Sequence, residues 1–163
     1  MRNALAAFSL VLITACGFQL RGVAELPFDS IHVPGSGTIA LELRRSIRSG
    51  SRTAVVDDPQ QAQARLEFTQ EVRQKEILSL TAEGRVREFR LLYRVGFRVH
   101  DGKGGEFLRP VSLQVARDMT YSDAQLLAKE AEEQALYRDM QQDMVQQIMR
   151  RLATARAPQA PPG

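Results

Sequence analysis

Three stretches in the middle of the chain alternate apolar and polar residues, which is the pattern of strands with one buried and one solvated face. Their apolar positions are Ala64, Leu66, Phe68 and Val72 in the first, Phe89, Leu91, Tyr93, Val95, Phe97 and Val99 in the second, and Phe107, Val111, Leu113, Val115 and Met119 in the third. Glycine-containing segments at residues 82–84 and 101–105 separate the stretches and are typical of hairpin turns. The pattern therefore predicts an antiparallel meander.

A shorter segment before the meander has helical periodicity. Its apolar residues recur every four positions, at Ile39, Leu43 and Ile47. Thr38 is placed as the N-cap of this helix, and Gly50 marks its end. We expect short strands on either side of the helix, at residues 30–34 and 53–56.

A longer helix is predicted near the C-terminus. Ser122 and Gln125 fit a capping box, with Tyr121 and Leu126 placed as a hydrophobic staple. The apolar stripe of this helix recurs at four-residue spacing, at Leu136, Met140, Met144, Ile148 and Leu152. We expect the stripe to cover the apolar face of the meander, although it could instead dock a partner. The predicted architecture is α+β, with two helices on one face of a mostly antiparallel sheet.

The start of the chain has the order of a secretory signal. Arg2 precedes an apolar run over residues 4–13 that is too short to cross a bilayer as a permanent helix, and small residues then lead to Cys16, the only cysteine. We expect cleavage after Ala15 and lipid attachment at Cys16, as in the lipobox of a bacterial lipoprotein. Glycine rather than aspartate at position 17 favours delivery to the outer membrane. The alternative is a plain signal peptide with an incidental cysteine nearby.

These features divide the chain into an expected signal peptide at 1–15, one domain at 16–153, and a disordered proline-rich tail at 154–163. Hydrophobic residues make up 44% of the chain and charged residues 25%, as in an ordinary globular protein. The net charge is +3, and the anionic partners within reach of an exported protein are membrane lipids and phosphorylated glycolipids. We therefore expect no nucleic-acid partner. No second long apolar segment follows, so we expect no membrane span.

Catalytic and metal-binding patterns are sparse. His32 and His100 have no flanking ligands at metal spacing, and lipidation would consume the cysteine. The glycine-lysine segment at 102–105 lacks the spacing of a phosphate-binding loop, and it joins two strands rather than opening a helix. The adjacent Asp57 and Asp58 precede a proline and fit a turn. The sequence therefore predicts no enzyme, no cofactor and no metal site, and it argues against the alternative of a periplasmic hydrolase.

The predicted solvated face of the meander is rich in arginine. The arginines expected to point away from the helices are Arg65, Arg73, Arg90, Arg94 and Arg98, with Arg85 and Arg87 near the hairpin entry and Glu67, Glu71 and Glu88 interleaved. A solvated mixed-charge face explains this pattern as well as a binding face does. Guanidinium groups match phosphates with paired hydrogen bonds, so the face could instead meet lipid phosphates or the polar lumen of a barrel. On that second hypothesis Arg85, Arg87 and Arg90 contact a glycolipid.

Three parts of the chain carry a family resemblance. The segment at 16–22, Cys-Gly-Phe-Gln-Leu-Arg-Gly, resembles the start of the mature LPS-assembly lipoproteins of the LptE or RlpB family. The similarity continues through the Gly84 hairpin with Glu88 and Phe89, and through the helix from Leu-Leu-Ala-Lys-Glu at 126–130 to Ile-Met-Arg-Arg-Leu at 148–152.

The resemblance implies two helices packed on a four-stranded sheet. It also implies a lipid-anchored plug, on the periplasmic side of the outer membrane, inside the outer-membrane barrel LptD. Such a protein would assist assembly of the barrel and bind lipopolysaccharide during its insertion into the outer leaflet. Lys129 matches a basic position of the family and becomes a lipid-contact candidate, whereas Ala82 stands where the hairpin would be expected to carry a basic residue. A free-standing glycolipid-binding lipoprotein and a structural tether remain as alternatives.

Overall fold

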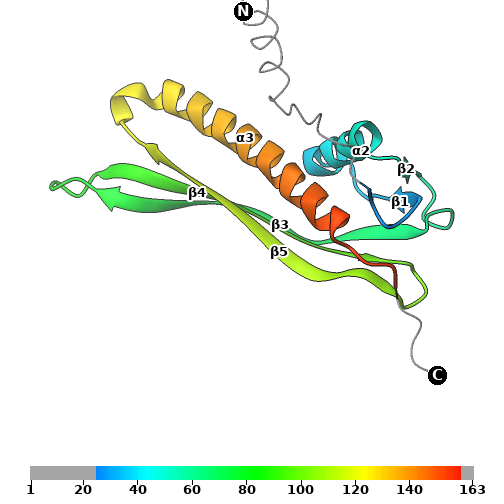
Figure 1. Cartoon of the computed structure of the whole chain (residues 1–163). Coiled ribbons are helices and arrows are strands. Elements are labelled where there is room, and N and C mark those ends of the chain that lie inside the picture. Colours follow the sequence, from blue (N-terminus) through cyan, green and yellow to red (C-terminus); the bar gives the residue numbers. More distant parts are fainter. Residues whose placement is uncertain (1–24, 159–163) are drawn as a thin grey trace, which may run out of the picture.

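The computed structural model describes residues 25–158 of the chain. It has two helices on one face of a single sheet, which confirms the α+β class and the placement of both helices (Figure 1). The elements in chain order are β1 (Ser30–His32), α2 (Thr38–Gly50), β2 (Ala54–Val55), β3 (Ala64–Leu80), β4 (Val86–His100), β5 (Glu106–Thr120) and α3 (Leu126–Ala153).

The sheet has five strands in the order β2-β1-β3-β4-β5, so the four-stranded prediction is wrong by one strand. β1 pairs in parallel with both β2 and β3, whereas β3, β4 and β5 form the predicted antiparallel meander. The additional edge strand arises because the chain returns from α2 and pairs Ala54 with Ser30 and Val55 with Ile31. The short strands expected at 30–34 and 53–56 are thus present as β1 and β2. The count of four strands came from the fold that the family resemblance implied.

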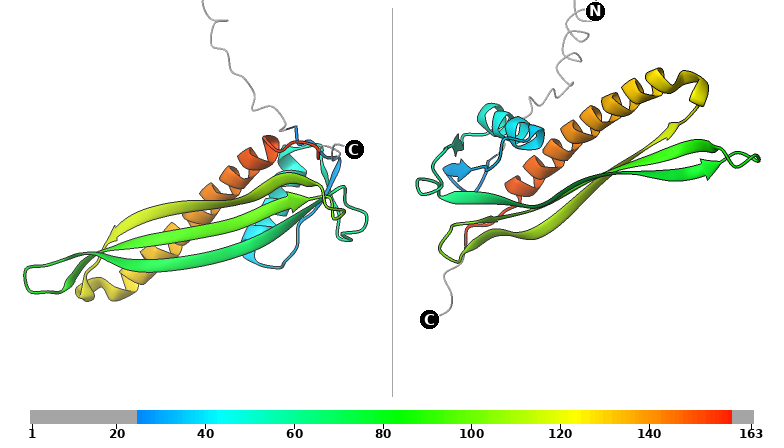
Figure 2. Two further views of the ribbon diagram at one scale, coloured as in Figure 1. Left: turned by 90° about the horizontal axis from the view of Figure 1, so that it is seen from below. Right: turned by 180° about the vertical axis from the view of Figure 1, so that it is seen from behind.

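The long hairpin gives the molecule two distinct ends. We call the end with the β3–β4 turn and the start of α3 the distal end, and the end with β1, α2 and β2 the proximal end (Figure 1). The turn between β3 and β4 extends beyond the start of α3 in every view (Figure 2). Gly84 in this turn has a φ of 79°, a conformation that glycine adopts without strain.

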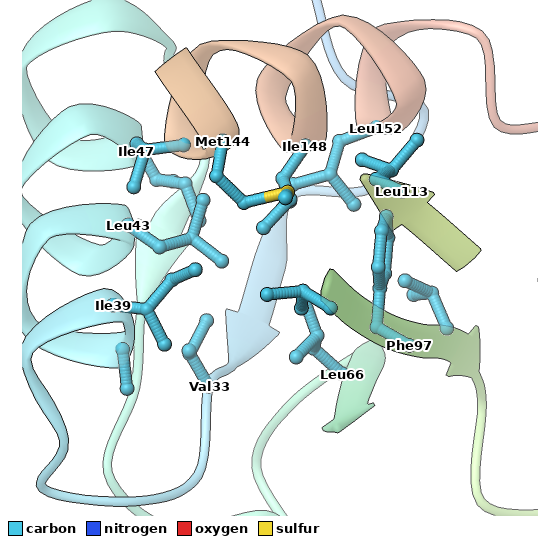
Figure 3. Close-up of a cluster of buried hydrophobic side chains, with 14 of the residues drawn as sticks. Val33, Ile39, Leu43, Ile47, Leu66, Phe97, Leu113, Met144, Ile148 and Leu152 are labelled. Carbon is cyan, nitrogen blue, oxygen red and sulfur yellow. The ribbon is translucent and has the colours of Figure 1, made fainter. Parts of the chain in front are cut away.

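The hydrophobic core lies between the helices and the proximal and central parts of the sheet (Figure 3). All but one of the residues that the periodicity placed on the inner faces of the helices are fully buried: Ile39, Leu43 and Ile47 from α2, and Met140, Met144, Ile148 and Leu152 from α3. Leu136, the first residue of the α3 stripe, is partly buried against the same core. Phe97 of β4 and Leu66 of β3 pack beneath them. The stripe on α3 therefore packs against the sheet, as expected, and it is not free to dock a partner.

Both predicted helix caps differ from the structure. Thr38 is the first residue of α2, and the N-cap is Gly37, which makes no side-chain capping bond. The capping-box prediction is wrong as well, because Ser122 precedes a short 3₁₀ turn at Asp123–Gln125 and its side chain makes no capping bond. The backbone N–H of Gln125 donates to the Ser122 carbonyl instead, at 3.0 Å, and α3 begins only at Leu126. Local backbone bonding thus replaces side-chain capping at this end.

A β-bulge in β3 changes which residues face the helices. Phe68 lies opposite Phe97 and Gln70 lies opposite Gly96, so Thr69 is an extra residue between two consecutive pairs. Because one added residue reverses the alternation, Arg73 comes to lie opposite the buried Tyr93. The prediction that Arg73 points away from the helices is therefore wrong, as is the placement of Val72 on the buried face, because Val72 lies opposite Arg94.

Gly96 has no side chain, and the side chain of Thr69 in the bulge occupies the space beside it. A Cβ atom on Gly96 would lie 2.6 Å from Thr69 Oγ1, which is closer than van der Waals contact allows. We expect Gly96→Val to lower the free energy of unfolding by about 1–3 kcal/mol through overpacking, as measured by urea denaturation.

Two further variants test this steric explanation. Ser112→Val, on the β5 residue opposite Gly96, should change stability by less than about 0.5 kcal/mol because Ser112 is exposed. In a Thr69→Ala background, Gly96→Val should cost less. An equal loss in both backgrounds would contradict the proposed clash.

Candidate functional site

Four basic residues singled out from the sequence lie at the distal end. Arg85 follows the β3–β4 turn, Arg87 and Arg90 belong to the first part of β4, and Lys129 lies in the first turn of α3 (Figure 1). We call Arg85, Arg87, Arg90 and Lys129 the distal basic cluster. The fold thus brings to one end of the molecule residues of β4 and α3, which are separated along the chain by the whole of β5.

Arg90 is held by a carboxylate on the neighbouring strand. Its Nε and Nη2 donate to the two oxygens of Asp118 at 2.8 and 2.9 Å, a bidentate pair across β4 and β5. The hydrogen bond from Arg90 lowers the pKa of Asp118 below its usual value. Because both side chains remain about half exposed, the pair contributes little to stability.

The other arginines of this face are paired too. Arg98 donates to Glu67 at 2.6 Å, and Arg94 donates to Gln114 at 2.6 Å. Arg65 lies at the proximal end of β3 and donates to Gln60 at 3.2 Å. Along the central part of the sheet, the face away from the helices is therefore a mixed-charge surface whose cations already have partners.

Lys129 is the most buried member of the distal basic cluster. Its side chain is 13% exposed, and its Nζ donates to Glu132 at 2.7 Å and to Thr120 Oγ1 at 3.0 Å. Thr120 and Asp118 are two residues apart on β5, so the groups that hold Lys129 and Arg90 are separated by about 7 Å along one strand. The partners of the two cations are therefore close together, although Arg90 belongs to the face of the sheet away from the helices and Lys129 belongs to α3.

Arg85 and Arg87 differ from the other two members. Both are exposed, and within residues 25–158 their side chains form no hydrogen bond or ion pair. Arg85 bonds only through its backbone: its N–H donates to Thr81 Oγ1, and its carbonyl accepts from Thr81 N–H at 2.7 Å. The carbonyl of Arg87 accepts from Tyr121 N–H at 2.8 Å. Their guanidinium groups are therefore available to an anionic ligand.

A groove opens between the start of α3 and the distal parts of β4 and β5. It encloses about 330 Å³, and its apolar lining consists of Val86, Phe89, Met119 and Leu126. We call this feature the distal groove. Lys75 and Lys129 line it together with three carboxylates, those of Asp123, Glu130 and Glu133. The groove therefore combines an apolar floor with a polar margin that is not basic overall.

The contribution of Lys75 was not evident from the sequence. Its Nζ donates to Glu133 of α3 at 2.5 Å and lies 4.3 Å from the centre of the Phe89 ring. A cation over an aromatic ring is attracted to it, so Lys75 connects β3, β4 and α3 at the groove. Only the register set by the bulge places Lys75 on this face, and the alternation read along β3 gave no sign of it.

Arg73 forms a second polar cluster between α3 and the sheet. Its Nη2 donates to Gln141 at 3.0 Å, and its guanidinium carbon lies 5.1 Å from the Tyr93 ring and 5.3 Å from the Tyr137 ring. The Tyr93 hydroxyl donates to Glu71 at 2.7 Å. Burial, together with this bond to Glu71, raises the pKa of Tyr93 above its ordinary value. Arg73 and Glu71 thus support helix packing and are not part of the solvated face.

The aspartates and the histidine considered for catalysis or metal binding stabilise turns instead. Asp58 accepts from Gln60 N–H at 2.8 Å, and Asp101 accepts from the N–H groups of Lys103 and Gly105 at 2.7 and 2.9 Å. His100 Nδ1 accepts from Gly102 N–H at 3.0 Å. Within residues 25–158, no group of three or more His, Cys, Asp or Glu side chains could hold a metal ion.

Other sequence predictions fall partly outside the described region. Cys16 and the expected signal segment lie outside it, as do residues 159–163 of the expected tail. Ordered chain continues past residue 153, because Ala155 is buried in the core and Arg156 N–H donates to the Phe107 carbonyl at 3.1 Å. Among the described helices, none is long and apolar enough to span a membrane.

Comparison with known proteins gives a consistent result. The family model described as "LptE: Lipopolysaccharide-assembly" matches residues 28–152. A relative from Pectobacterium atrosepticum, named LPS-assembly lipoprotein LptE, is 27% identical over 150 residues, which cover 88% of this chain and 80% of the relative.

Two solved structures are similar as well. An uncharacterized lipoprotein B from Nitrosomonas europaea is 42% identical with a TM-score of 0.72, over 84% of this chain and 90% of that one. The rare lipoprotein B from Shewanella oneidensis has the same fold at 23% identity, with a TM-score of 0.65 over 80% of this chain and 94% of that one.

Proposed function

The chain belongs to the LptE lipopolysaccharide-assembly family, and from this premise we propose that it is an outer-membrane lipoprotein that plugs the LptD barrel, helps to assemble that barrel, and binds lipopolysaccharide during its insertion into the outer leaflet. The family match spans almost the whole described fold, and this observation carries the proposal. The proposed role is binding and assembly, and it requires no chemical step.

The surface of the sheet suits a protein enclosed by a polar barrel lumen. Both helices lie on one face of the sheet and bury the core, so the opposite face of the sheet is not covered by either helix (Figure 2). The cations of that face are paired with Asp118, Gln114 and Glu67 rather than gathered into one strongly charged patch. Such a surface stays hydrated, and a wide barrel has a polar interior.

The distal basic cluster supports the lipopolysaccharide-binding part of the proposal. Arg85 and Arg87 have free guanidinium groups, and guanidinium binds phosphate through paired hydrogen bonds. Arg90 and Lys129 are held by Asp118 and Thr120, which are two residues apart on β5, and both cations could exchange these partners for a phosphate. We propose all four residues as glycolipid contacts.

The experiment that tests the barrel partnership is affinity purification of the tagged full chain from detergent-solubilised outer membrane. We expect a large β-barrel protein, identified by mass spectrometry as LptD, to co-elute in equal amount. Recovery of the lipoprotein with bound lipopolysaccharide but without a barrel would contradict the plug and favour a free-standing glycolipid-binding lipoprotein. Recovery with neither would contradict the whole proposal.

We also propose residues 1–15 as a signal peptide and Cys16 as the lipid attachment site. Cys16→Ser should move the protein from the membrane fraction to the soluble fraction, because a chain without acyl groups keeps no stable anchor. Cell fractionation followed by immunoblotting measures this change. The thermal unfolding midpoint should not change, because the substitution alters none of the core side chains found within residues 25–158. Unaltered membrane association of the variant would contradict lipidation at Cys16.

A further inference from the structure

Exposed apolar side chains are concentrated at the distal end. Among residues 25–158, six large hydrophobic side chains are exposed, and five of them belong to the distal parts of β3 and α3. These five are Ile77, Leu78, Leu80, Leu126 and Leu127. The sixth, Leu41, lies on α2 at the other end of the molecule. Single exposed leucines are ordinary, but a group at one end marks a candidate contact surface.

The strand register joins these residues to the distal groove. Ile77 lies opposite Phe89 and Leu80 lies opposite Val86, and both Phe89 and Val86 line the groove. Side chains of directly opposed residues share a face and stand about 5 Å apart. Leu126 forms part of the groove wall. Leu127 is the next residue of α3, about 100° further round the helix, so it lies beside the groove rather than in it. Ile77, Leu80 and Leu126 thus extend the apolar lining of the groove, and Leu78 and Leu127 are exposed close to it along the chain.

Charge is distributed unevenly around this surface. The two lysines of the groove are already paired, Lys75 with Glu133 and Lys129 with Glu132, and further carboxylates lie at the margin. The free cations are those of Arg85 and Arg87, beside the turn that follows Leu80. An apolar surface flanked by unpaired guanidinium groups is complementary to a molecule with an acyl chain and a phosphate.

We infer that the distal groove and its exposed rim bind an acyl chain of the glycolipid, while Arg85 and Arg87 hold its phosphate. The inference rests on the proposed function and adds to it the part of the ligand that each group contacts. The groove, of about 330 Å³, is large enough for only part of one acyl chain. The exposed rim residues extend that contact along β3.

The test compares two ligands that differ only in their acyl chains. Binding of the purified mature chain is measured with intact lipopolysaccharide and with fully deacylated lipopolysaccharide, which keeps its phosphates and sugars. The variant is Leu80→Ser with Leu127→Ser, because these side chains are 53% and 81% exposed and their replacement leaves no buried cavity. Leu41→Ser is the matched control, since Leu41 is 49% exposed and lies on α2.

We expect the double variant to bind intact lipopolysaccharide at least tenfold more weakly, since each leucine loses apolar contact with the chain. Its affinity for the deacylated ligand should be unchanged, and Leu41→Ser should bind both ligands as the original chain does. Equal thermal unfolding midpoints for all three proteins show that folding is unaffected.

Three results would overturn the inference while leaving lipopolysaccharide binding intact. These are equal binding of both ligands by the original chain, an unchanged affinity of the double variant for the intact ligand, and an equal loss for both ligands. If the double variant instead lost co-purifying barrel protein with its lipid affinity unchanged, the rim would be a protein contact. Failure of the original chain to bind either ligand would overturn the lipopolysaccharide-binding part of the proposed function itself.

Discussion

Replacement of all four members of the distal basic cluster by alanine should weaken lipopolysaccharide binding roughly a hundredfold. An exposed ionic contact changes an affinity by about threefold, and four such losses multiply to this value. The residues replaced are Arg85, Arg87, Arg90 and Lys129, and binding is measured with purified protein at low ionic strength. Added salt should reduce the affinity of the original chain more than that of the variant, because screening weakens only the contacts that are present.

A variant with the same charge change at the proximal end separates this effect from net charge. Arg45, Arg48, Arg52 and Lys103 also comprise three arginines and one lysine, and all four are exposed. Their combined alanine variant should retain most of the affinity. If both quadruple variants lost affinity equally, attraction would depend on overall charge and the distal basic cluster would not be a site.

Phe97→Ala should remove about 3–5 kcal/mol from the free energy of unfolding, a loss large enough to leave a domain of this size marginally folded. Phe97 is 0% exposed and lies in the core beneath α3, beside Leu113 and Leu66 (Figure 3). The loss combines the transfer of the ring from the core with the cavity that remains after its removal. Urea denaturation followed by circular dichroism measures it.

Leu127→Ala supplies the contrast for this prediction. Leu127 is 81% exposed, so its truncation should change stability by no more than about 0.5 kcal/mol. A loss of less than 1 kcal/mol for Phe97→Ala would show that the core can collapse around the missing ring. That result would contradict the close packing of helices on sheet on which the fold depends.

The alternation of apolar residues predicted β4 and β5 well because both strands keep most of one face on the core. From Leu91 to Val99 every second residue of β4 is buried, as the pattern indicated. β3 was predicted only as far as Phe68. The extra residue at Thr69 reverses the alternation, so that Glu71, Arg73 and Lys75 occupy the inner face. Ile77 is the first apolar residue that follows the new alternation, and it comes eight residues after Thr69.

The residue types of the candidate site could be predicted from the sequence, but the hydrogen bonds and ion pairs that its cations form could not. Arginines near the hairpin and Lys129 were evident as residue types from the sequence and from the family resemblance. Which cations are free depends on strand register, because Arg90 reaches Asp118 only when these two residues lie opposite each other. The groove depends on how α3 starts, and the 3₁₀ turn before Leu126 has no clear signal in the sequence.

The bulge at Thr69 has a consequence for how the molecule opens. On its proximal side the sheet meets the helices through apolar side chains. On its distal side Leu91, Tyr93 and Met140 are still fully buried in the same core, and polar contacts are added to them. These contacts join Arg73 to Gln141, Lys75 to Glu133 and Arg117 to Asp143. Because partly exposed polar contacts stabilise less than buried apolar ones, we expect local opening to begin in this part of α3, where amide hydrogen exchange should be faster than in the core.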